Sequence, residues 1–121
     1  MFKKGFTMPP VVDLSGNWQM KQSNGFYVDV SMNQDGPTLN AFCSHSEGRV
    51  RSTAATGTAN GDSFILVITW DGGSKGEYTG RLETGFFTNA SEGRLMGNTR
   101  DLNNPGSTAT WEVMDRVFTR P

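Results

Sequence analysis

The sequence predicts an all-β protein of about eight antiparallel strands, arranged as an up-and-down barrel. Three observations support this prediction. The 121 residues include 15 glycines, 8 phenylalanines and 3 tryptophans, a composition that suits short strands joined by tight turns. No stretch shows the sustained 3.6-residue apolar spacing of an amphipathic helix. Turn signals recur at intervals of roughly 8–12 residues, as they do in β-sandwiches and barrels.

The turn signals divide the chain into eight segments. Asn60-Gly61 and Asp71-Gly72 are typical of these turns, because such pairs supply the positive φ that two-residue hairpins require. Between the turns, strands are predicted over residues 14–22, 26–34, 38–45, 51–59, 63–71, 75–83, 93–101 and 108–119. No proline interrupts any of them, as expected for paired strands.

Several of these segments alternate with the two-residue period of a strand. One face of the second strand is predicted to carry Phe26, Val28, Val30 and Met32. One face of the last strand is predicted to carry Ala109, Trp111, Val113 and Val117. The run 64–68 is apolar on both faces, which indicates a strand covered by the barrel interior on one side and by a partner surface on the other.

Short connections predict that each strand pairs with its neighbour in the sequence. Such a meander would leave two bare edges unless the sheet closed on itself. A closed barrel of about eight strands is just wide enough for a packed interior or one small ligand. A two-sheet sandwich uses the same pattern of strands and remains the alternative.

Length and composition limit the organisation and the partners of the chain. Residues 1–10 are predicted to be a disordered leader, and residues 11–121 a single barrel domain. The net charge is −1 with interspersed signs, so the clustered basic face of a nucleic-acid-binding protein is absent. No apolar run is long enough to span a membrane, and no signal peptide is visible. The protein is therefore predicted to be soluble, either cytoplasmic or secreted.

The sequence gives little support for catalysis, and we predict a protein that is not an enzyme. His45 is the one histidine and Cys43 the one cysteine. They lie two residues apart on one predicted strand, with no third group to orient the imidazole ring. The acidic residues are scattered along the chain, so no metal site and no cofactor is predicted.

The tryptophans point to ligand binding instead. Trp70 ends an apolar strand just before a turn, and an aromatic ring at such a place can line the mouth of a barrel. Trp18 and Trp111 belong to the first and last strands, where such rings can fill the barrel floor, and we predict this role for Trp18. The polar residues that could orient a ligand are Ser44, Tyr78, Asn98, Arg100 and Asp115.

The order of several short motifs resembles the avidin/streptavidin family over residues 14–120. The motifs are Ser15-Gly16-Asn17-Trp18, Asp35-Gly36 followed by Leu39, Thr56-Gly57, the strand ending in Trp70, Tyr78-Thr79-Gly80, and Phe118-Thr119-Arg120. The resemblance implies an eight-stranded barrel that binds its ligand in the open end. It also implies a homo-oligomer, either a dimer or a tetramer.

The same resemblance implies roles for particular residues. Trp70 matches the tryptophan that stacks on biotin, and Ser44 matches the serine that bonds the ureido group of biotin. Phe42 stands where a ureido-binding tyrosine is expected, and Tyr78 where a tryptophan lines the pocket. Asp115 resembles the ureido aspartate, although it stands one residue too far from the closing motif.

Other positions depart from the family pattern. Met20 stands where the family has an asparagine donor, and Arg116 occupies the strict position of the aspartate. The seventh predicted strand has no tryptophan. We therefore expect the pocket of this protein, which lacks these donors, to bind either a biotin-like ligand or another small molecule.

A second set of motifs resembles the Oscillatoria agglutinin-type lectins. It consists of Gly16-Asn17-Trp18, Val28-Asp29-Val30, Gln34-Asp35-Gly36, Thr38-Leu39-Asn40 and Glu47-Gly48. This resemblance implies an antiparallel barrel that binds glycans. The leading hypothesis is thus a small-molecule-binding barrel, with a lectin and a protein-interaction module without a pocket as the alternatives.

Overall fold

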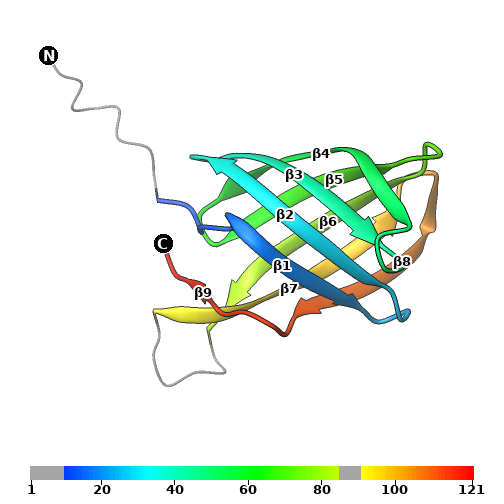
Figure 1. Ribbon diagram of the computed structural model, residues 1–121. Coiled ribbons are helices and arrows are strands. Elements are labelled where there is room, and N and C mark those ends of the chain that lie inside the picture. The colour runs from blue at the N-terminus through cyan, green and yellow to red at the C-terminus, as the bar shows by residue number, and fades with distance from the viewer. Residues whose placement is uncertain (1–9, 85–90) are drawn as a thin grey trace, which may run out of the picture.

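The computed structural model describes residues 10–84 and 91–121, which form one closed antiparallel barrel with no helix in those ranges (Figure 1). The strands are β1 (Gly16–Gln22), β2 (Tyr27–Asp35), β3 (Thr38–His45), β4 (Val50–Asn60), β5 (Ser63–Trp70), β6 (Lys75–Glu83), β7 (Glu92–Asp101), β8 (Asn104–Val113) and β9 (Phe118–Thr119). Neighbouring strands pair in sequence from β1 to β8, and the β1–β8 pairing closes the ring. The predicted eight-stranded up-and-down barrel is confirmed, and the sandwich alternative is wrong. Residues 1–9 of the predicted leader lie outside the described residues.

The two-residue alternation decides which side chains fill the barrel. In β2, Val28, Val30 and Met32 are buried, while the residues between them are exposed, as predicted. Phe26 is not buried with them, because it precedes β2 in the turn after β1 and is 47% exposed. Ile65, on the outer face of β5, is 37% exposed, and the partner surface expected over this face stays a prediction.

The end of the chain differs from the single strand predicted over 108–119. β8 ends at Val113, and the chain then leaves the sheet before β9 pairs with the start of β7 through Phe118 and Gly93. The guanidinium Nη1 of Arg116 donates a hydrogen bond to the Ser15 carbonyl oxygen at 2.9 Å. This bond holds the chain across the end of the barrel, and it leaves Val117 45% exposed rather than in the core.

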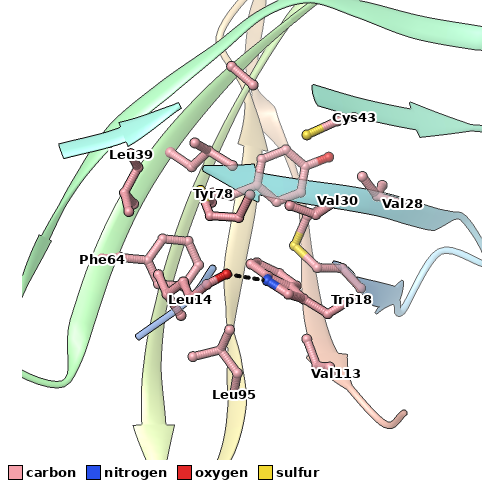
Figure 2. Close-up of a cluster of buried hydrophobic side chains, with 14 of the residues drawn as sticks. Leu14, Trp18, Val28, Val30, Leu39, Cys43, Phe64, Tyr78, Leu95 and Val113 are labelled. Atoms are coloured by element: carbon pink, nitrogen blue, oxygen red, sulfur yellow. Dashed lines mark hydrogen bonds between the residues drawn. The ribbon is translucent and has the colours of Figure 1, made fainter. Parts of the chain in front are cut away.

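Aromatic rings close the end of the barrel at which β1 begins. The Trp18 indole Nε1 donates to the Leu14 carbonyl oxygen at 2.8 Å, and both residues are buried (Figure 2). Trp18 packs edge-on against Phe64 and Phe118, with ring centroids 6.3 and 5.7 Å apart. Trp111 extends the cluster, 5.8 Å from Phe64. The two tryptophans of the first and eighth strands therefore fill the barrel floor, as predicted for Trp18.

A short segment before β1 completes this closure. Val12 donates its amide to the Gly61 carbonyl oxygen at 2.7 Å, and the amide of Leu14 reaches the side-chain oxygen Oε1 of Gln34 at 2.6 Å. Val12 and Leu14 have no exposed surface. Since these side chains seal one end of the barrel, the opposite end is the candidate entrance to the interior.

Candidate ligand-binding mouth

The open end of the barrel lies where β1, β3, β5 and β7 end. A cavity of about 340 Å³ opens there, between the ends of the strands and the hairpins that join them. Its lining residues are Gln22, Asn24, Phe26, Val28, His45, Trp70, Ser74, Lys75, Gly76, Thr99, Arg100, Asp101, Ser107, Thr108 and Ala109. This volume falls within the range of roughly 300–1,000 Å³ that is usual for small-molecule sites.

The rings of Phe26, His45 and Trp70 form one wall of the mouth. Phe64, Leu66, Ile68 and Trp70 alternate along β5 and face inward, so the last of them reaches the mouth. The His45 ring lies 4.7 Å from Trp70 and 5.3 Å from Phe26, edge-on to both. A flat apolar group entering the cavity would therefore meet aromatic surface.

Hydrogen-bonded polar groups lie below this wall. The Tyr78 hydroxyl donates to Gln22 Oε1 at 2.8 Å, and Gln22 Nε2 donates to Asn24 Oδ1 at 3.0 Å. Gln22 and Thr99 are buried although both are polar. Burial raises the pKa of Tyr78 to about 12, opposed by a hydrogen bond with Thr99. Tyr78 is therefore protonated at neutral pH and acts as a fixed hydrogen-bonding group.

The titratable groups of β3 are uncharged at neutral pH. Burial lowers the pKa of His45, although the negative charge of Asp71 opposes the shift, and Ser46 Oγ lies 2.9 Å from the imidazole Nδ1. Burial raises the pKa of the Cys43 thiol to about 12. A protonated thiol is a poor nucleophile, and the Cys43 side chain is buried.

Only part of the predicted site meets at the mouth. Trp70 lines the cavity, and Tyr78 lies in the buried network beneath it. Arg100 stands at the rim, where its Nε donates to Glu77 Oε1 at 2.9 Å. Asn98 instead lines a groove on the outside of the barrel.

Three other predicted residues face away from the interior. Phe42 and Ser44 lie on the outer face of β3, because Cys43 and His45 occupy its inward positions. Asp115 follows β8 and lines the same outer groove as Phe42 and Ser44. A one-residue shift in register moves a side chain to the opposite face of a strand. The biotin site implied by the resemblance is therefore divided between two faces, which corrects the expectation that these residues share one pocket.

The mouth also contains residues that belong to no site predicted from the sequence. They are Gln22 and Thr99, together with His45, for which the sequence favours a place on the surface or at the mouth over a catalytic role. Their strands alternate apolar and polar residues, and each of the three stands on the inward face near a strand end. A polar residue at an inward position next to a turn is the signal that indicates a barrel mouth.

A larger groove of about 850 Å³ runs over the outer faces of β4 to β8 and includes Asn98. The two aromatic rings beneath it, Phe64 and Trp111, are only 5% and 3% exposed. The groove also presents Ile65, which is 37% exposed, and Met96, beside threonine, asparagine and ion-paired side chains. The mouth is smaller, but it combines the exposed ring of Phe26 and the half-buried ring of His45 with a buried polar network. Trp70, behind them, is 8% exposed.

Residues 10–84 and 91–121 contain no group of three or more His, Cys, Asp or Glu side chains placed to hold a metal ion. No helix in these ranges is long and apolar enough to cross a membrane. Neither models of known protein families nor curated protein sequences give a match to this chain.

The buried network beneath the mouth leads to a prediction about stability. Tyr78→Phe removes the hydroxyl that donates to Gln22 Oε1, leaving a buried acceptor without its donor. We expect the free energy of unfolding to fall by about 1–3 kcal/mol, measured by urea denaturation. Tyr27→Phe is the matched control, because Tyr27 is 47% exposed and should change stability by less than about 0.5 kcal/mol. Equal stabilities for the two variants would contradict the proposed importance of this bond.

Proposed function

We propose that the protein is a non-catalytic binding barrel that holds a small molecule with a flat ring in its open mouth. The observation that carries this proposal is the contrast between the two ends of the barrel. One end is sealed by Trp18, Phe118 and the segment before β1. The other holds a cavity of about 340 Å³ walled by His45 and Trp70. Aromatic walls with a few fixed polar groups are typical of small-molecule sites.

The polar groups indicate how a ligand would be oriented. Gln22 and Thr99 lie at the lower side of the cavity, and Lys75, Arg100 and Asp101 lie at its rim. Arg100 is paired with Glu77, so the charges at the rim balance. This balance and a neutral His45 favour a ligand with little net charge. The ring would pack against Trp70, while its polar edge would bond to the amide and hydroxyl groups.

Biotin is the first ligand to test, because Trp70 occupies the ring-stacking position implied by the resemblance. Its ureido group would meet different partners here, since Ser44 faces outward and the inward positions of β3 hold Cys43 and His45. We therefore expect biotin to bind weakly compared with other flat-ring compounds of similar size. A fragment library of such compounds should be screened beside biotin.

The test is a titration followed by tryptophan fluorescence and calorimetry. We expect a flat-ring ligand to quench fluorescence saturably, and Trp70→Phe or His45→Ala to weaken its binding at least tenfold, or about 1.4 kcal/mol. Phe42→Ala is the control, because Phe42 lies on the outer face of β3 and should leave this affinity unchanged. Absence of saturable binding across the library, or full affinity in both mouth variants, would refute the proposal.

A further inference from the structure

The outer face of β1, β2 and β3 carries a separate groove of about 410 Å³. Strand pairing sets its side chains in two rows. Asn17, Ser31 and Phe42 are direct neighbours in one row, and Gln19, Asp29 and Ser44 in the other. Side chains at such paired positions lie about 5 Å apart. The two rows thus give the groove a defined arrangement of five polar side chains and one aromatic ring, and Asp115 also lines it.

Phe42 is exposed in this polar setting. It is 56% exposed, although it lies in the middle of a paired strand, and its row neighbours are an asparagine and a serine. Folding of the barrel therefore does not account for this ring. A ring that stays accessible beside amide and hydroxyl groups can pack against the apolar C–H face of a pyranose while the neighbouring groups bond to its hydroxyls.

Two of the polar side chains, Gln19 and Asp29, are held in place before any ligand binds. Gln19 Nε2 donates to Asp29 Oδ1 at 2.8 Å across the β1–β2 pair. This bond fixes a planar amide next to a planar carboxylate. Ordering these groups in the free protein reduces the entropy lost on binding. Together they offer several acceptors to the closely spaced hydroxyl donors of a sugar.

The charge of the groove narrows the class of ligand. Asp29 and Asp115 line it, and no lysine or arginine among the described residues does. Arg51 neighbours Ser44 on β4, but its Nε donates to the Gly48 carbonyl oxygen and it does not line the groove. Two carboxylates without a cation repel phosphate, sulfate and sialic acid. Neutral hydroxyl-rich ligands fit this charge pattern.

From these observations we infer that the outer face of β1–β3 is a binding platform for neutral saccharides, with Phe42 stacking on a pyranose ring. This site is independent of the mouth, because the described residues that line one do not line the other. Loss of the small-molecule function would leave this inference intact.

The test is a glycan array carrying neutral oligosaccharides of mannose, glucose, galactose and N-acetylglucosamine, together with sialylated counterparts. We expect at least one neutral glycan to bind, and its sialylated form to bind more weakly. Calorimetry with the strongest neutral binder should then show at least a tenfold loss of affinity in Phe42→Ala and in Asp29→Asn.

Two control variants show whether the glycan binds in this groove or elsewhere on the barrel. Tyr27→Ala removes an exposed aromatic ring from the same face of β2, but outside the groove, and should change affinity less than twofold. Trp70→Phe alters the mouth and should leave glycan binding unchanged. No signal from any neutral glycan, or binding by Phe42→Ala within twofold of the parent protein, would overturn the inference.

Discussion

Replacing Gly97 with alanine should destabilise the barrel by about 3 kcal/mol or more, among the largest effects expected of any single methyl group in this chain. Gly97 faces Gly80 across the β6–β7 pair. A Cβ atom at Gly97 would overlap the Thr79 carbonyl oxygen and lie 2.7 Å from the Gly80 Cα. Both contacts are with backbone, so two paired strands would have to separate for the methyl group to fit. Urea denaturation measures the loss.

Gly106 provides the matched control for this experiment. It lies in β8, and a Cβ atom there would meet nothing within 4 Å. Gly106→Ala should therefore change the free energy of unfolding by less than about 1 kcal/mol, and the loss of chain entropy in the unfolded state favours a small gain. If Gly97→Ala were as stable as Gly106→Ala, the close approach of β6 and β7 would be wrong. A glycine within a strand often marks such an approach, as Gly97 does and Gly106 does not.

The architecture could be predicted because local signals agreed with one another. Gly36 and Gly61 stand in hairpin turns with positive φ, and the alternation of Val28 and Val30 places their side chains in the barrel. The exception is the predicted last strand. The break between β8 and β9 depends on Arg116 bonding to the Ser15 carbonyl oxygen, a contact between the two ends of the described chain that no local pattern reveals.

The candidate site was harder to predict because it depends on register. Phe42 and Cys43 are adjacent and both apolar, so the sequence does not show which of them faces inward. The resemblance selected Phe42 and Ser44, whereas the structure buries Cys43 and brings His45 to Trp70. Trp70 could be predicted to line the mouth because its place at the end of an apolar strand sets both its face and its height in the barrel.

The stability of the barrel should fall steeply at alkaline pH, because two acidic groups, the Cys43 thiol and the Tyr78 hydroxyl, are buried in their neutral forms. The fall should be larger than ionisation of exposed groups alone would cause. Burial raises the pKa of Cys43 from 9.0 to about 12 and that of Tyr78 from 10.0 to about 12. Both groups ionise more readily in the unfolded chain, so their contribution to stability is complete below pH 9 and is lost as the pH rises toward 12. At one pKa unit per about 1.4 kcal/mol, the combined loss between pH 8 and pH 11 is about 4 kcal/mol.

The measurement is a series of urea denaturation curves between pH 8 and pH 11, and the double variant Cys43→Ala/Tyr78→Phe identifies the source of the slope. This variant is less stable at pH 8, because it loses a packed thiol and the bond to Gln22. Its stability should nevertheless decline less steeply with pH, since no buried group remains at either position to ionise on unfolding. A slope equal to that of the parent protein would assign alkaline unfolding to other groups, and would mean that Cys43 and Tyr78 are not held neutral by burial.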